Sequence, residues 1–74
     1  MKVQKLKGKL REKEKTYKDC AKVLGCSVTT VSNKMQGKIP FDCWEAEQIS
    51  NWLHLTNMER VDIFLSKDLH DMQE

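Results

Sequence analysis

The residues best suited to chemistry lie together at positions 28–36 of the chain. Hydroxyl, amide and ammonium groups recur there at helical spacing on one side, supplied by Thr29, Thr30, Asn33, Lys34 and Gln36. The segment contains no Asp or Glu. An ordinary solvated helix face usually mixes Glu with Lys, whereas side chains of these types meet base edges and phosphates. The pattern favours contact with nucleic acid over the plainer alternative, a polar helix surface without a function.

Catalytic and metal-binding patterns are poorly represented in the chain. A length of 74 residues leaves little room for both a core and a walled active-site pocket. Cys20, Cys26 and Cys43 form no C-x-x-C pair, and both His54 and His70 stand far from them. An odd cysteine count without an export signal indicates reduced, structural thiols. We therefore expect no enzymatic activity, no metal, no cofactor and no small-molecule substrate.

The net charge of +2 conceals two halves of opposite sign. Positions 1–38 hold eleven Lys and Arg against three Asp and Glu, whereas positions 39–74 hold two against eight. This polarity suggests one face for a polyanion and another turned away from it, although the N-terminal lysines could equally be a solvated helix face. No apolar run approaches the ~20 residues of a membrane helix, and the basic start lacks a secretory apolar stretch, so we expect a cytoplasmic protein.

The spacing of turn-forming residues predicts an all-α chain, because strand-like alternation is absent. Helices are expected at about 3–14, 17–24, 28–36, 43–53 and 57–65. Their side-chain N-caps are expected at Thr16, Ser27, Asp42 and Thr56. At Thr16 the reciprocal cap should be imperfect, because Asp19 stands where the capping box usually has Glu or Gln. One domain is expected over 1–66, followed by a polar tail at 67–74.

Apolar residues at helical spacing define the expected core. Over the first four helices these are Val3, Leu6, Leu10, Tyr17, Cys20, Ala21, Leu24, Val28, Val31, Met35, Cys43, Ala46, Ile49 and Leu53. In the last helix Met58, Val61, Ile63, Phe64 and Leu65 are available for burial.

Gly25 marks a tight turn between the second and third expected helices. A left-handed residue there would end one helix, and Ser27 starts the next one two residues later. Helices joined by so short a turn cannot lie antiparallel, so they must cross at a steep angle. Ala21 is the small residue that would let them approach each other.

The run from Thr16 to Lys38 resembles the helix-turn-helix of the Cro/repressor (XRE) family of phage and bacterial regulators. The positions that match the family pattern are Ala21, Gly25, Ser27, Val31, Ser32 and Gly37. The similarity extends from Leu6 to about Leu65, and the chain looks like a minimal, Cro-like form. Two departures are Tyr17, where many members have a Gln that grips phosphate, and Lys34, where an aromatic or aliphatic residue is common.

The resemblance implies a compact five-helix, lambda-repressor-like domain with a helix-turn-helix at about 16–37. Such a domain binds double-stranded operator DNA, commonly as a homodimer on two-fold-related half-sites, in a bacterial cell or a phage-infected host. Helix 28–36 would enter the major groove and read bases through Val28, Thr29 and Asn33. The expected phosphate contacts are Lys7, Arg11, Tyr17, Lys18, Thr30, Lys34, Gln36 and Lys38. Dimer contacts are expected from the acidic half, at Trp52, Leu55 and the last helix, with Trp44 a weaker candidate.

Two other binding roles remain open. The same fold could serve as a protein-interaction module, such as an antitoxin or antirepressor, although a face without carboxylates argues against it. RNA binding through the lysine-rich first helix is less favoured, because no platform of exposed aromatic pairs is present.

Overall fold

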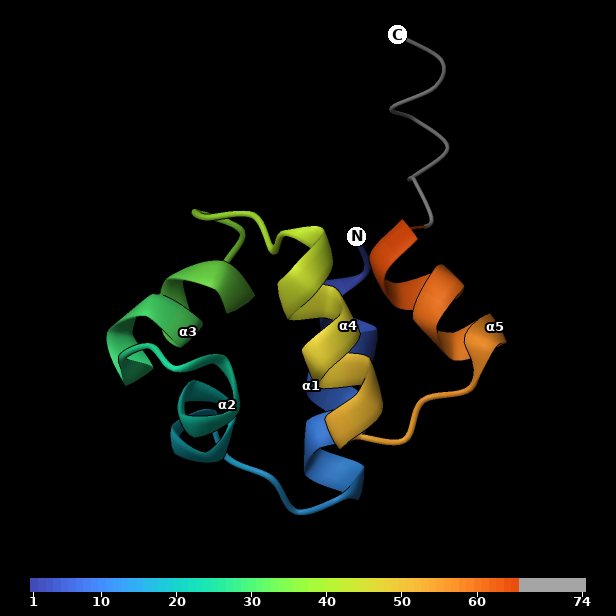
Figure 1. Cartoon of the computed structure of the whole chain (residues 1–74), viewed down its shortest axis with the longest axis horizontal. Helices are drawn as coiled ribbons and strands as arrows, with labels where there is room; N and C mark the ends of the chain where they lie inside the picture. The colour runs from blue at the N-terminus through green and yellow to red at the C-terminus, as the bar shows by residue number, and fades with distance from the viewer. Residues whose placement is uncertain (66–74) are drawn as a thin grey trace, which may run out of the picture.

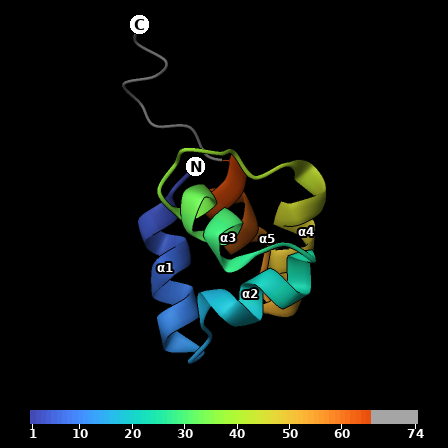
Figure 2. The same cartoon turned by 90° about the vertical axis from the view of Figure 1, so that its left-hand side faces the viewer.

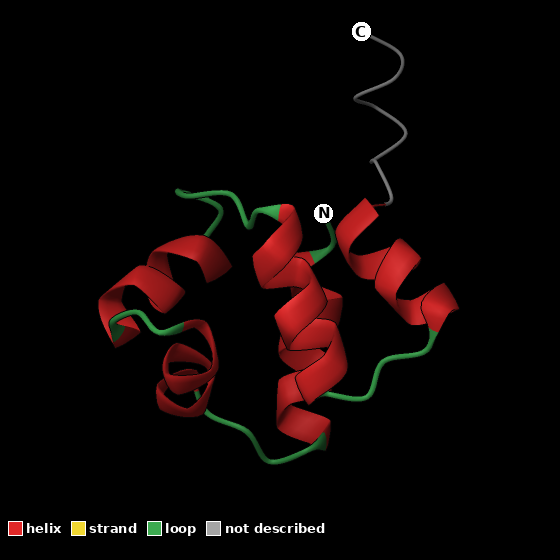
Figure 3. Cartoon of the chain, in the orientation of Figure 1, coloured by secondary structure: helices red, strands yellow, loops and turns green. Residues whose placement is uncertain are grey.

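Helices account for most of the chain that the structure describes, residues 1–65 of the computed structural model. They are α1 (Val3–Glu12), α2 (Tyr17–Leu24), α3 (Val28–Met35), α4 (Cys43–Trp52), α5 (Asn57–Arg60) and a π-helical turn, η1 (Val61–Leu65), that continues α5 (Figure 1). No strand occurs within residues 1–65, so the prediction of an all-α domain is confirmed (Figure 3). The predicted tail at 67–74 lies outside the described residues. None of the described helices combines the length and apolarity needed to cross a bilayer.

Side-chain caps define where the helices begin. All four predicted N-caps accept a hydrogen bond from the backbone amide three residues later. The expectation of an imperfect box at Thr16 was wrong, because Asp19 Oδ2 accepts from the Thr16 amide at 3.0 Å and completes it. Helix α1 has no such cap; instead the Lys2 amide donates to the carbonyl of Ile63 at 2.8 Å, which ties its start to η1.

The core is built from one side of each helix. Its buried members are Leu6, Leu10, Cys20, Ala21, Leu24, Val31, Met35, Ile49, Leu53 and Ile63. Helix α2 packs against both α3 and α4, and α1 packs against η1. Two residues that the sequence assigned to the core, Val28 and Cys43, are exposed, and so are Met58, Val61 and Leu65, which were available for burial in the last helix. Val28 and Cys43 are the first residues of their helices, whereas Ile63 and Phe64 already fill the inner side of the last one.

The turn between α2 and α3 follows the expected geometry. Gly25 has φ +69°, the left-handed conformation that ends a helix at little cost only for glycine. The amide of Cys26 donates to the carbonyl of Ala21 at 3.0 Å, which closes the turn. The two helices run in clearly different directions, with α3 lying across α2 (Figures 1 and 2).

Ion pairs tie the last helix to α1. Lys2 Nζ lies 2.7 Å from Asp62 Oδ1, Lys5 pairs with the same carboxylate, and Lys9 pairs with Glu59. The hydrogen bond from Lys9, together with one from the Thr56 amide, lowers the pKa of Glu59 from 4.5 to about 2. Exposed pairs of this kind each contribute little, so the tie depends on several acting together.

A buried ion pair joins α3 to α4. Lys34 Nζ lies 2.8 Å from Glu45 Oε1, and their side chains are only 8% and 13% exposed. The same ammonium donates to the carbonyl of Pro40 at 3.0 Å and lies 5.6 Å from the centre of the Phe41 ring. Glu45 Oε1 also accepts from the Asp42 amide at 3.0 Å, so one carboxylate both caps α4 and neutralises Lys34.

Replacing Lys34 leaves Glu45 as a buried charge without a counter-ion. Lys34→Met should therefore lower the free energy of unfolding by about 3 kcal/mol, measured by chemical denaturation. Adding Glu45→Gln removes the stranded charge and keeps a side chain able to cap α4, so the double variant should recover part of the loss. Lys22→Met, on the exposed side of α2, is the matched control. A double variant less stable than Lys34→Met would contradict this account.

The contribution of Glu59 to stability should depend on pH. Its pKa is about 2 in the folded chain against an ordinary 4.5, so the stabilisation is complete above the higher value and is lost as pH falls through the lower one. Glu59→Gln should therefore lower the melting temperature near neutrality, and its deficit relative to wild type should shrink on acidification. Thermal unfolding across this range tests the expectation, with the exposed Glu47→Gln as control. A deficit that does not change with pH would speak against it.

Candidate nucleic-acid interface

The outer side of α3 presents the residues expected to contact bases. Thr29 is exposed, Asn33 is half-buried and the Val28 side chain is 46% exposed. Neither Thr29 nor Asn33 uses its side chain in a hydrogen bond with another residue of the described chain. Because the two residues stand four positions apart on a helix, they lie next to each other on this side. Their polar groups are free to bind an external partner.

Other polar side chains of α3 are bonded within the helix. Ser27 Oγ accepts from the Thr30 amide at 3.1 Å and lies 3.0 Å from Thr30 Oγ1. Gln36 Nε2 donates to Ser32 Oγ at 3.1 Å. A hydroxyl or a side-chain amide retains further donor and acceptor capacity in such bonds. Thr30 and Gln36 therefore support the shape of the surface and can still bond to an anion.

Lys34 does not belong to this surface. The sequence assigned it to phosphate contact, but its residue exposure is only 7% and its ammonium is bonded to Glu45 and Pro40. Lys34 is buried because it lies in the last turn of α3, where the loop at 37–42 folds over its side chain. That prediction was wrong. The exposed cation near the end of α3 is Lys38, which has no carboxylate within 4.0 Å among residues 1–65.

A second group of cations surrounds the start of α2. Lys7, Arg11 and Lys15 line a shallow hollow together with Leu10 and Tyr17. No described carboxylate lies within ion-pair distance of these three cations. The hollow therefore combines three cations outside ion pairs with a tyrosine at a helix N-terminus, a combination that suits a phosphate group, and the carboxylate of Asp19 in the first turn of α2 offsets part of the charge of Lys15.

The side chains in and beside this hollow differ in their exposure and contacts. The Tyr17 ring packs against the core and is half-buried, while Lys18 in the first turn of α2 is exposed. Lys15 Nζ lies 5.9 Å from the centre of the Trp52 ring. The sequence reasoning missed Lys15, although its position directly before the N-cap Thr16 was a usable signal.

The aromatic and aliphatic residues proposed for subunit contact lie elsewhere. Trp52 and Leu55 are half-buried and pack against the core of their own chain. Trp44 is 55% exposed on α4. Other large apolar side chains, Met58, Val61 and Leu65, are exposed on the last helix.

The cysteines and the possible metal ligands of residues 1–65 do not form a reactive cluster. Burial raises the pKa of the Cys20 thiol to about 11, which disfavours the reactive thiolate. Cys26 is half-buried, Cys43 is exposed, and all three cysteines are free. Within residues 1–65, no three His, Cys, Asp or Glu side chains converge as a metal site would require.

Comparison with known proteins identifies a family for this chain. No curated protein and no solved structure matches the chain. A family model described as "Protein of unknown function (DUF739)" matches residues 1–66, a range that includes every residue that the structure describes. Because the match covers most of the sequence, the chain belongs to this DUF739 family.

Proposed function

We propose that this protein is a transcriptional regulator that binds double-stranded DNA in a sequence-specific manner, with α3 in the major groove. One observation supports this above all. On the outer side of α3 the side chains of Thr29 and Asn33 have no hydrogen-bond partner among residues 1–65, and they lie in a stretch, residues 20–41, that contains no Asp or Glu. A polyanion can approach such a surface without meeting a like charge.

Affinity would come from the phosphates. Lys7, Arg11, Lys15 and Lys18 lie beside the start of α2, and Lys38 follows α3. With the N-terminal amides of α2 and α3, these cations can hold the backbone on both sides of the groove. Contacts of this kind position the protein and make binding depend on salt, but they carry no sequence information.

Specificity would come from Asn33 and its neighbours. An Asn side chain can bond bidentately to the N6 and N7 positions of adenine, and Thr29 can bond to several bases. The exposed Val28 side chain offers an apolar contact for a thymine methyl group. The resemblance to the Cro/repressor family supports the same placement and a two-fold-symmetric operator. Selection of bound sites from random duplexes tests the proposal directly, and failure to enrich any site would refute it.

Asn33 is the residue whose loss should reduce specificity. Asn33→Ala should cost about 1–3 kcal/mol on the selected operator and little on random duplex DNA. Asn51→Ala, an exposed Asn on α4, is the matched control and should leave both affinities unchanged. Fluorescence anisotropy on the two DNA substrates provides the measurement. An equal loss on both would mean that Asn33 does not read a base.

Replacing Lys38 and replacing Lys34, both near the end of α3, should have different effects on the salt dependence of DNA binding. Lys38→Gln should weaken binding to operator and random DNA alike and make the slope of log K against log salt shallower by about 1, because one phosphate contact is lost. Lys34→Arg should leave the slope unchanged, because its position faces Glu45 and not the solvent. Titrations at several salt concentrations measure both slopes. An unchanged slope in Lys38→Gln would show that this lysine contacts no phosphate.

A further inference from the structure

One cation of the hollow at the start of α2 lies against an aromatic ring. The ammonium of Lys15, which lines the hollow, is 5.9 Å from the centre of the Trp52 ring. The face of an indole attracts a cation at this distance, because the electrons of the ring make that face negative. Lys15 precedes α2 and Trp52 ends α4, so the contact joins two segments that are far apart in the sequence.

The backbone after α1 fixes where Lys15 leaves the helix. The amide of Lys15 donates to the carbonyl of Leu10 at 2.8 Å, and the amide of Glu14 donates to the carbonyl of Arg11 at 3.1 Å. These two bonds form a Schellman motif, with Glu14 at φ +56° as its left-handed residue. Such a conformation is uncommon outside glycine and persists only where the surrounding structure holds it.

Trp52 is fixed by the same motif at the end of α4. The amide of Leu55 donates to the carbonyl of Ser50 at 2.9 Å, and His54 has φ +56°. The Trp52 ring is half-buried and packs against the core. The loops that follow α1 and α4 lie at the same end of the molecule (Figure 1). Two backbone motifs therefore bring Lys15 and Trp52 together.

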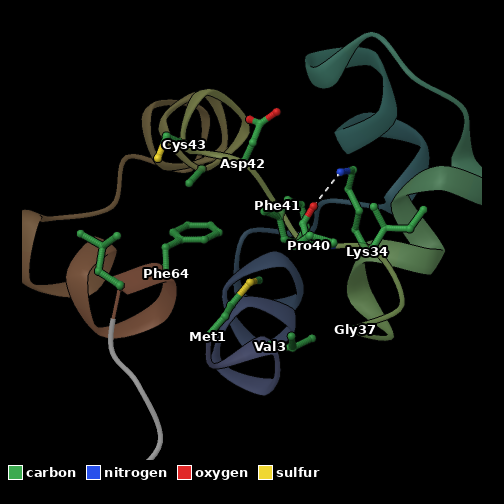
Figure 4. A pocket seen from close by; sticks show the side chains of 12 residues that line it. Met1, Val3, Lys34, Gly37, Pro40, Phe41, Asp42, Cys43 and Phe64 are labelled. Carbon is green, nitrogen blue, oxygen red and sulfur yellow. Dashed lines mark hydrogen bonds between the residues drawn. The ribbon is translucent and has the colours of Figure 1, made fainter. Parts of the chain in front are cut away.

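An aromatic ring orients a cation without neutralising it. Lys34 shows the contrast, because its ammonium pairs with Glu45 and donates to the carbonyl of Pro40 (Figure 4). Lys15 has no carboxylate within 4.0 Å among residues 1–65. Asp19, which interacts with Lys15 at longer range, uses its carboxylate to cap α2. The charge of Lys15 is thus held in place and remains available to an anion.

We propose that Trp52 is a positioning residue that holds Lys15 ready for a DNA phosphate. This inference rests on the proposed function and adds to it a residue that touches no DNA itself. A free lysine side chain loses much of its rotamer freedom when its ammonium binds. Contact with the ring removes part of that freedom before binding, so the phosphate contact costs less.

A double-mutant cycle on the selected operator tests whether Trp52 acts through Lys15. Trp52→Leu should weaken binding about two- to fivefold, the size expected for one cation–π contact at an exposed site. In a chain that carries Lys15→Gln, the same substitution should change the affinity less than about 1.5-fold, because its partner is gone. Lys18→Gln removes another exposed cation beside α2 and is the matched control. Its effect should multiply with that of Trp52→Leu.

A second variant separates positioning from packing, because Trp52 also contacts the core. Trp52→Phe keeps an aromatic ring and should lose less affinity than Trp52→Leu. Thermal unfolding followed by circular dichroism measures the stability of each variant. Equal losses of affinity in Trp52→Phe and Trp52→Leu would contradict a role for the ring.

Nuclear magnetic resonance on the full chain measures the contact without DNA. The ring current of the indole should move the side-chain methylene signals of Lys15 upfield, and Trp52→Leu should abolish that shift. A wild type without the shift overturns the inference, whatever the DNA results.

The DNA results distinguish failure of this inference from failure of the proposed function. If the wild type selects no DNA site, the proposed function is wrong and the role of Trp52 fails with it. If the wild type binds an operator and Trp52→Leu has the same effect with and without Lys15, the proposed function stands and only this inference is wrong.

Discussion

A single carboxylate oxygen, Glu45 Oε1, joins α3, whose outer side we propose reads DNA, to the start of α4. It accepts from the Asp42 amide at 3.0 Å and from Lys34 Nζ at 2.8 Å, so the start of α4 and the last turn of α3 share one acceptor. Burying two charges is costly unless the remaining donors are satisfied. The Pro40 carbonyl and the Phe41 ring complete that requirement for the ammonium. The loop at 37–42 is thereby fixed over Lys34, and with it the placement of Asn33 and Lys38.

Ion pairs between the two halves of the chain determine which charges remain free on the surface. The acidic half does not simply face away from the basic half, as the charge count suggested. Three of its carboxylates, Glu45, Glu59 and Asp62, pair with lysines of the basic half. Most of the described cations outside these pairs lie near α2 and the end of α3, whereas Arg60 lies on α5. The positive surface is therefore smaller than the sequence implies, and it is concentrated beside the groove-reading helix that we propose.

Local signals in the sequence were enough to predict most of the fold. Caps such as Thr16 and the left-handed Gly25 act over three or four residues, so their types alone specify where helices begin and end. The burial of Lys34 could not be predicted in this way, because it depends on a loop that folds back from later in the chain. The exposure of Met58, Val61 and Leu65 could have been predicted, because five apolar residues within positions 57–65 are more than one side of a short helix can bury. Thr29 is exposed and Asn33 is half-buried on the outer side of α3, which agrees with the sequence-based prediction, whereas their contact with bases remains a proposal.

The last helix depends on contacts with the rest of the chain for its stability. Helix α5 has four residues and η1 five, far below the length at which an isolated helix is stable in water. It is held by Ile63 in the core, by the bond from the Lys2 amide and by exposed ion pairs that contribute little individually. The last helix should therefore form only together with α1 and the core, because the contacts that hold it come from those parts of the chain.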